Sequence, residues 1–240
     1  MPSYYPTEDL NLNISRGLVK NTSVRNIFGV QSATPDANFV PLWENATVYT
    51  YPTVAVQLDV QTAATDTATI KIIGLDADYN EISEDVVLNG IVATDQTTNA
   101  EFLRVNDLIT IAGNCTGNVT IVQTSTTDVV AKMLAGTGRN QASIYTVPAG
   151  CELHLTRLNG FTAEVGPQPN ERTAFFRNFV QLPSGVILRV AELAFHNNFN
   201  IYRTNPFKYS EKTDIQLQMK ASSGSQECAI FGEGILIKVS

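Results

Sequence analysis

The sequence predicts an all-β protein, and three features lead to that prediction. Stretch after stretch is rich in Val, Ile, Thr and Tyr, several of them alternate polar and apolar residues, and Gly, Asn or Asp turns separate them. Charged residues make up only 16% of the chain, and Thr, Asn, Ser and Gln take their place. A surface of short neutral polar side chains suits strands and tight turns better than exposed helices.

The expected strands fall into two groups on either side of the turn-rich segment 135–143. The first group is 46–60, 67–75, 84–94, 101–113 and 117–125, and the second is 142–150, 151–165, 172–183, 185–198, 213–222 and 228–239. Each group has about as many strands as a sandwich needs. We therefore expect two β-sandwich (jelly-roll-like) domains, over residues 45–135 and 136–240.

One segment between the groups has helical spacing instead. In residues 126–136, an apolar face would contain Val129, Val130, Met133 and Leu134, and Gly136 would stop the helix. We expect at most this one helix in an otherwise β protein.

Residues 1–44 differ from the rest because prolines, polar turns and isolated apolar residues follow no sustained period. Such a segment cannot close a core of its own, so it predicts an extended N-terminal arm that docks on the rest of the chain or on a neighbouring subunit. The residues expected to form the interface are Leu12, Ile14, Val24, Ile27 and Phe28 as anchors, with Phe39 and Trp43 fixing the arm to the first sandwich.

Composition excludes several classes of function. The net charge is −7 and no basic run occurs, which argues against binding to nucleic acid. No stretch approaches the roughly 18 apolar residues of a membrane helix, and the first residues do not resemble a secretory signal. The three cysteines, Cys115, Cys151 and Cys228, are far apart and predict buried free thiols rather than a disulfide scaffold or a zinc site.

The nearest approach to a metal motif is Asp76, Asp78 and Asn80, at alternate positions like the start of a calcium-binding loop. Such a loop needs Gly at its sixth position and Glu at its twelfth, whereas this chain has Glu81 and Val87 there. Asp and Asn are also favoured in tight turns. The sequence therefore predicts a hairpin tip rather than a cation site.

No catalytic pattern emerges either, so we expect no enzyme and no cofactor. His154 and His196 each lie in an alternating strand with no second metal ligand nearby, and no G-x-S-x-G elbow is present. The carboxylates form no pair whose spacing suggests a glycosidase. The many aromatic residues of the second half fit either a carbohydrate-stacking surface or, as we favour, core and subunit interface.

Several short motifs, in this order and spacing, resemble an uncharacterised group of tailed-bacteriophage virion proteins found in phages of marine bacteria and cyanobacteria. The motifs fall at Gly74–Asp76, Tyr79–Glu81, Leu88–Gly90, Arg104–Asn106 and Tyr145–Gly150. The resemblance covers about residues 10–155 and includes the opening that leads to Trp43. The group often has a longer turn where this chain has only residues 61–68.

The resemblance implies a virion part without catalysis, made in the host cytoplasm and located on the phage particle surface. We expect a head decoration (cement) protein, trimeric, that binds the major capsid protein and stabilises the head. Its partners would be itself and that capsid protein, with no nucleic acid and no membrane. The alternatives are a neck, tail or fibre component that binds the host surface and, less favoured, a polysaccharide-degrading enzyme.

Overall fold

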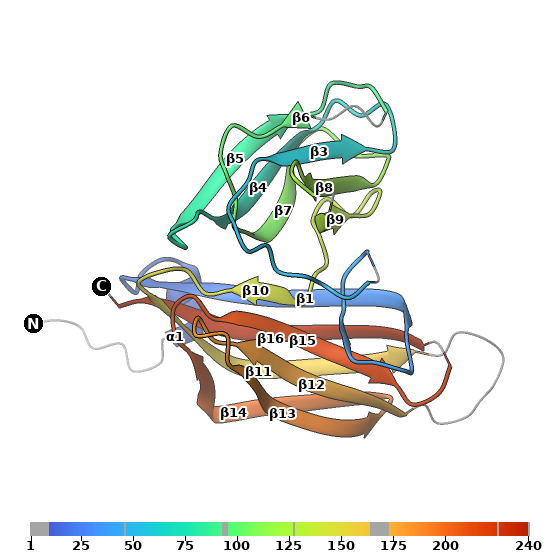
Figure 1. Cartoon of the computed structure of the whole chain (residues 1–240). Helices are drawn as coiled ribbons and strands as arrows, with labels where there is room; N and C mark the ends of the chain where they lie inside the picture. Colours follow the sequence, from blue (N-terminus) through green and yellow to red (C-terminus); the bar gives the residue numbers. More distant parts are fainter. Residues whose placement is uncertain are drawn as a thin grey trace, which may run out of the picture.

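A computed structural model of the protein describes residues 10–45, 47–92, 96–126, 128–163, 173–224 and 226–239. The all-β prediction is confirmed: apart from the short helix α1 (Leu10–Ser15), every regular element in these ranges is a strand. No helix in the same ranges is long and apolar enough to cross a membrane. The strands form two units of different size, one standing over an edge of the other (Figure 1).

The larger unit consists of two sheets. One sheet has the order β1-β16-β11-β14, and the other has the order β10-β15-β12-β13, with β2 also pairing with β15. The strands are β1 (Thr22–Thr34), β2 (Val40–Pro41), β10 (Ile144–Thr146), β11 (Cys151–Ala163), β12 (Thr173–Gln181), β13 (Ile187–His196), β14 (Asn198–Tyr209), β15 (Asp214–Ala221) and β16 (Gln226–Lys238).

The inner faces of these two sheets share one hydrophobic core. Ile27, Leu155 and Ile230 come from the first sheet, and Phe176 and Leu217 from the second, and all five are at most 2% exposed. Alternation along the strands makes this possible: in β12 every second side chain is buried, because successive side chains of a strand point to opposite faces.

The smaller unit has the same plan with shorter strands. Its sheets have the orders β6-β3-β8-β9 and β5-β4-β7, and they face each other across a second core that includes Val60, Ile72 and Ile121. The strands are β3 (Leu58–Thr62), β4 (Thr69–Leu75), β5 (Glu81–Val87), β6 (Gln96–Thr97), β7 (Arg104–Ala112), β8 (Val119–Gln123) and β9 (Val129–Met133).

The predicted arm is wrong for the residues that form β1 and β2. β1 pairs antiparallel with β16 from Thr22↔Ile237 to Thr34↔Gln226, and β2 pairs with β15 at Gln218↔Pro41. These segments are integral strands of the larger unit, so that unit is built from both ends of the chain and the smaller unit is inserted between β2 and β10. Residues 1–9 of the predicted arm lie outside the described residues.

The predicted helix over 126–136 is also wrong, because residues 129–133 form β9. β9 contains a bulge: Ile121 pairs with Ala131 but Val122 pairs with Val129, which leaves Val130 as the extra residue. Val130 and Ala131 are consequently both buried, and the apolar spacing comes to resemble a helical face.

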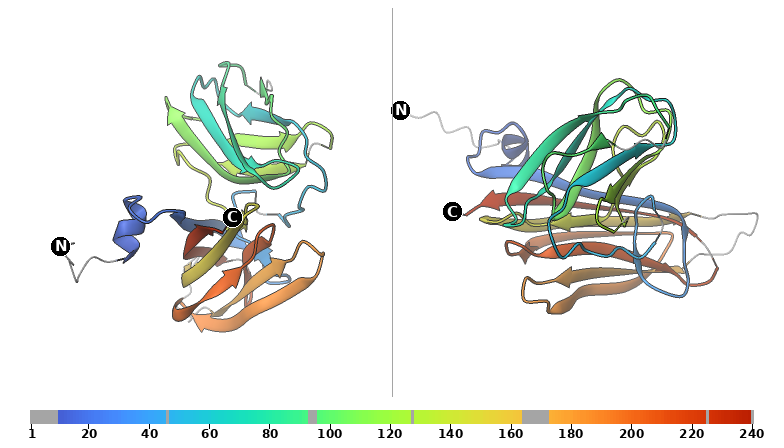
Figure 2. Two further views of the ribbon diagram at one scale, coloured as in Figure 1. Left: turned by 90° about the vertical axis from the view of Figure 1, so that its left-hand side faces the viewer. Right: turned by 45° about the horizontal axis from the view of Figure 1, so that its top comes forward.

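The smaller unit stands over the edge of the larger unit where β1 and β10 run. All three ribbon views place the smaller unit over this edge (Figure 2). The segments 42–57 and 134–143 connect them, and Trp43, Tyr49 and Ile144 form a small third core beneath these connections.

Candidate functional site at the junction of the two units

A buried ion pair joins the two units. Arg104, at the start of β7, donates from Nε to Oδ1 of Asp214 and from Nη2 to Oδ2, both at 2.9 Å. Asp214 begins β15 of the larger unit, and the two residues are only 6% and 5% exposed. Both ions are therefore bidentate and almost completely removed from water, which is tolerable only where the remaining polar atoms are also satisfied.

The other polar atoms around this pair do find partners. Nη1 of Arg104 donates to the carbonyl oxygens of Pro52, at 2.6 Å, and Leu103, at 2.9 Å. Asp214 Oδ1 accepts a further hydrogen bond from the hydroxyl of Thr146 at 2.5 Å. Burial alone would lower the pKa of Arg104, but its hydrogen bonds to Asp214 and the charge of Asp214 outweigh burial and raise it. The pair is held in its charged form.

Tyrosine rings enclose the guanidinium. Its carbon lies 4.8 Å from the ring centroid of Tyr51 and 5.7 Å from that of Tyr79, distances typical of cation–π contacts. Tyr51 in turn packs edge-to-face on Tyr49, with centroids 5.0 Å apart. Burial raises the pKa of both Tyr49 and Tyr51, so they act here as neutral walls that exclude water.

A second polar bridge runs parallel to the ion pair. The side chain of Asn106 donates to the carbonyl of Thr146 and accepts from its amide, both at 2.9 Å, in the manner of one more strand pair. The amide of Ala149 donates to the carbonyl of Tyr79 at 2.8 Å. Three of the motifs that carry the sequence resemblance, around Tyr79, Arg104–Asn106 and Tyr145–Gly150, thus meet at this junction.

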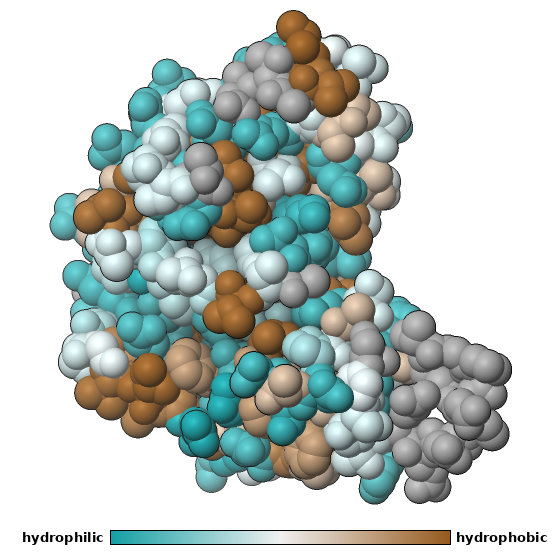
Figure 3. Space-filling model, turned by 45° about the vertical axis from the view of Figure 1, so that its right-hand side comes forward, coloured by the Kyte–Doolittle hydropathy of each residue, from teal (hydrophilic) through white to brown (hydrophobic). Residues whose placement is uncertain are grey.

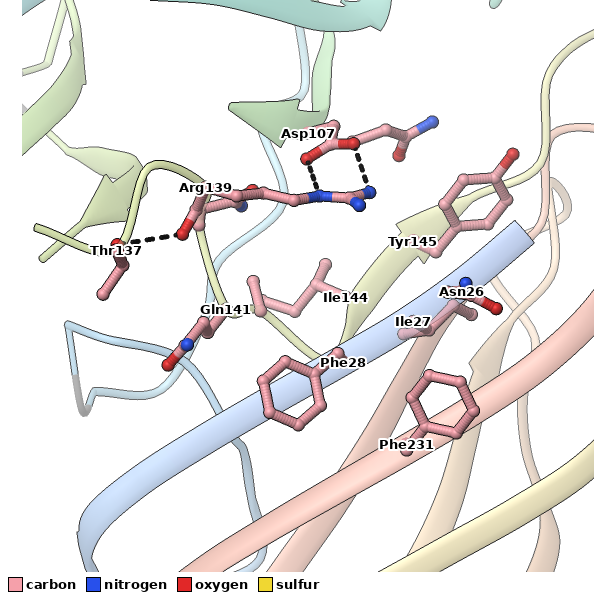
Figure 4. Close-up of a pocket in the computed structure, with 13 residues that line it drawn as sticks. Asn26, Ile27, Phe28, Asp107, Thr137, Arg139, Gln141, Ile144, Tyr145 and Phe231 are labelled. Carbon is pink, nitrogen blue, oxygen red and sulfur yellow. Dashed lines mark hydrogen bonds and ion pairs between the residues drawn. The ribbon is translucent and has the colours of Figure 1, made fainter. Parts of the chain in front are cut away.

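A cavity of about 230 Å³ opens beside the junction. Phe28 of β1 and Phe231 of β16 lie on one side of it, and Asp107 and Arg139 lie on the other (Figure 4). Arg139 donates from Nε to Asp107 Oδ1 at 2.9 Å and from Nη2 to Oδ2 at 2.5 Å. Because this ion pair already uses the charges that face the cavity, the cavity suits a neutral or aromatic side chain better than a charged ligand.

The aromatic side of the cavity continues onto the outer face of the first sheet. There Phe28, Phe161, Ala229 and Phe231 line a shallow apolar depression, which we call the outer patch, with Asn159, Asn198 and Asn200 beside it. Phe28 is 38% exposed and Phe161 47%. On the side shown in Figure 3, exposed hydrophobic residues lie in groups among polar ones on both units. Outside the outer patch, Val186, Ile187, Leu188 and Val190 are also exposed. Protein–protein interfaces commonly combine an apolar centre with a polar rim.

The seven predicted interface residues separate into two sets. Leu12 and Phe28 are exposed, and Val24 and Phe39 are half-buried. Ile14, Ile27 and Trp43 are at most 4% exposed because they pack within this chain, so they cannot serve as anchors for a partner. Phe39 lies under Arg177, 4.2 Å from ring centroid to guanidinium carbon, and so contacts the larger unit and not the first sandwich as predicted.

The predicted hairpin at Asp76–Asn80 is confirmed. β4 and β5 pair from Thr69↔Val87 to Leu75↔Glu81. Oδ1 of Asp76 accepts from the amides of Asp78 and Asn80, both at 2.9 Å, and Oδ2 accepts from the side chain of Asn80 at 3.1 Å. These oxygens tie the turn together. In the described residues no group of three His, Cys, Asp or Glu could hold a metal ion.

The histidines lie apart from the junction and from each other. Nδ1 of His196 lies 3.0 Å from the hydroxyl of Thr173, its cross-strand neighbour, and Nε2 of His154 lies 3.4 Å from Glu152. The three cysteines are free; Cys115 and Cys228 are buried as predicted, whereas Cys151 is half-buried.

Sequence reasoning missed the ion pair of Arg104 and Asp214, because its two members are 110 positions apart. It also missed one buried and one half-buried carboxylate. Asp66, only 4% exposed, accepts four hydrogen bonds, from Thr62, Thr116 and Gly117. Glu44 lies in a connection between the units and accepts a hydrogen bond from the amide of Gln141. A signal was present only for Arg104, which stands within a strand that is otherwise apolar or neutral apart from Asp107.

Comparison with known proteins gives little further guidance. No protein-family model and no curated protein matches the chain. Among solved structures, it shows weak similarity to a chain in the structure of the Gt strain of infectious bursal disease virus, with 11% identity, 91% of this chain and 73% of that chain covered, and a TM-score of 0.20. A chain of T=1 particles derived from the same virus gives 12% identity, coverage of 92% and 75%, and a TM-score of 0.17. Scores of this size do not establish a common fold.

Proposed function

We propose that the protein is a phage virion structural protein, specifically a trimeric decoration protein that binds the major capsid protein and stabilises the head. It would act by binding and not by catalysis, on the surface of the particle. The observation that carries this proposal is the meeting of three virion-protein motifs at the junction. Residues of three of the five motifs that give the sequence its resemblance make contacts that hold the smaller unit against the larger one.

The strand order of the larger unit supports the proposal. We infer that this unit is a jelly roll: counted along the chain with β2 and β10 as one strand, its sheets have the orders first-eighth-third-sixth and second-seventh-fourth-fifth. Double-sheet jelly rolls are common among viral capsid proteins, although they also occur in lectins and cupins. A second domain inserted into such a scaffold projects from it, as a decoration protein requires.

We assign the contact with the capsid protein to the outer patch. Phe28 is the aromatic residue among the predicted anchors, and it is exposed. It lies beside Phe231 across the strand pair β1–β16. Aromatic side chains surrounded by neutral polar groups are typical of the energetically dominant centre of an interface.

Copy number and attachment test this proposal. Densitometry of purified virions should give a copy number comparable with that of the major capsid protein; only a few copies per particle would instead favour a neck, tail or fibre component. Phe28→Ser with Phe161→Ser should lower attachment to capsids that lack the protein by at least about tenfold. Val48→Ser, a matched change at a residue 71% exposed, should leave attachment unchanged.

A further inference from the structure

The outer face of the second sheet of the larger unit combines cations with aromatic rings. Its strands place Phe175, Arg177 and Phe179 of β12 beside Arg189 and Glu192 of β13, with Lys220 of β15 and Phe39 next to them. We call this set the cation–aromatic face. Arg189 is exposed and Arg177 and Lys220 are half-buried, which leaves all three cations accessible to a partner.

The cations of this face are held in place by neutral groups. The guanidinium carbon of Arg177 lies 4.2 Å from the ring centroid of Phe39, and its Nε and Nη2 donate to Oε1 of Gln218 at 2.9 and 2.6 Å. Nζ of Lys220 lies 5.1 Å from the ring centroid of Phe175. Aromatic and amide groups orient a cation without cancelling its charge.

The positive charge of the face is not neutralised within the described part of the chain. No carboxylate there lies within ion-pair distance of Arg177, Arg189 or Lys220. Burial and the nearby charge of Arg189 lower the pKa of Arg177, and Glu192, opposite Arg177 in the strand pair, offsets this only in part. An anion placed here would relieve the repulsion between the two arginines.

The smaller unit carries the opposite charge. Residues 58–133 contain 11 Asp and Glu against 3 Lys and Arg, whereas the rest of the chain has 12 against 13. Two of those three cations are already engaged, Arg104 with Asp214 and Lys71 with Asp85. Several of the carboxylates are exposed, namely Asp78, Glu81, Asp85, Glu101 and Asp128.

We propose that the acidic smaller unit of one copy docks on the cation–aromatic face of a second copy. Contacts between two smaller units would bring like charges together, which disfavours a symmetric pairing through them. A head-to-tail contact instead joins opposite charges, and such contacts close into a ring when the rotation between copies permits, a trimer being one case. The inference goes beyond attachment to the capsid protein and rests on the proposed function only for the expectation that copies associate.

The construction of the face favours a protein partner over an acidic glycan. A sugar ring stacks on the open face of an aromatic side chain, but cations already lie over the rings of Phe39 and Phe175. A binding partner can therefore contact only the outward edge of each cation. Carboxylates on a folded surface, such as those of the smaller unit, can reach these edges.

Sedimentation velocity of the purified full-length protein tests the inference without capsids. The wild type should self-associate at about 50 mM NaCl and dissociate at about 500 mM, because salt screens exposed charges. Arg189→Glu should raise the dissociation constant by roughly tenfold at low salt. Lys20→Glu makes the same charge change at an exposed residue away from the face and should have no effect. Circular dichroism of each variant checks that it is folded.

A mixing experiment identifies the occupant. A variant with Asp78→Lys and Glu101→Lys should associate with the Arg189→Glu protein more strongly than either variant associates with itself. No recovery in the mixture, or a wild type that stays monomeric at low salt, would overturn the inference. So would binding of polygalacturonate, an acidic glycan probe, by a wild type that does not self-associate. The proposed attachment to capsids is tested with variants of Phe28 and Phe161. Its outcome is therefore independent of this test of self-association.

Discussion

Asp66 is buried and Glu44 is half-buried, and the surroundings of these two carboxylates shift their pKa values in opposite directions. Burial acts to raise both. For Asp66, hydrogen bonds from Thr116, Gly117 and Thr62 outweigh burial and lower the pKa to about 2. For Glu44, burial prevails over the hydrogen bond from Gln141 and raises the pKa to about 7. The first carboxylate therefore stabilises the fold when ionised and the second destabilises it.

Asp66→Asn should lower the free energy of unfolding by about 2 kcal/mol at neutral pH, because an amide cannot accept all four donors. Since the folded pKa lies below the ordinary value of 3.8, the contribution of Asp66 is complete above that value and is lost as the pH falls towards 2. Urea unfolding at several pH values measures this. A difference between variant and wild type that stays constant down to the acid limit would contradict it.

Glu44→Gln should have the opposite pH profile. The unfolded carboxyl ionises near 4.5 and the folded one near 7, so the wild type loses stability as the pH rises between these values. The variant should equal the wild type at about pH 4.5 and exceed it by about 3 kcal/mol at about pH 8. Glu101→Gln, at an exposed carboxylate, should change stability by less than about 0.5 kcal/mol throughout.

At the scale of elements, β1 shows why the sequence predicts most of the strands but not which strands pair with each other. In a hairpin such as β4–β5 the paired strands are neighbours in the sequence, and the turn residues between them predict the pairing. β1 pairs with β16 some 200 positions away, for example Phe28↔Phe231. Its alternation is also masked, because Ile27 faces the core while Phe28 and Val30 lie on an apolar outer face. A strand that is apolar on both faces has no period of two to detect.

The two apolar faces of β1 allow a matched pair of variants, one on each face. Ile27→Ala should cost about 2–4 kcal/mol of stability because it leaves a cavity between the two sheets of the larger unit. Phe28→Ala, one residue further along β1, should cost less than about 1 kcal/mol because the ring lies on the outer face. Urea unfolding measures both. Equal losses would mean that the outer patch is a second core and not a surface for a partner.

At the scale of the whole molecule, the sequence does not predict the junction, because the residues that pair there are far apart along the chain, 110 positions for Arg104 and Asp214. Arg104 and Asp214 belong to different units and different sheets, and no sequence pattern marks Asp214 as the partner of Arg104. The sequence resemblance marked Arg104, Asn106 and Tyr145–Gly150 without saying what they do. Their common role is to fix the smaller unit against the larger, and with it the direction in which the smaller unit projects.

Two arginines at the junction allow this role to be tested. Arg104→Met leaves Asp214 buried without its cation and should cost about 3–5 kcal/mol. Arg139→Met removes the cation from the pair with Asp107, where the arginine side chain is 55% exposed, and should cost less than about 1 kcal/mol. Scanning calorimetry should show one transition for the wild type and for Arg139→Met, since each unit unfolds with the other while the junction holds. Arg104→Met should instead show two transitions, because the smaller unit and the larger unit then each unfold alone. A single transition in Arg104→Met, lowered only in temperature, would mean that the connections 42–57 and 134–143 couple the units without the buried ion pair.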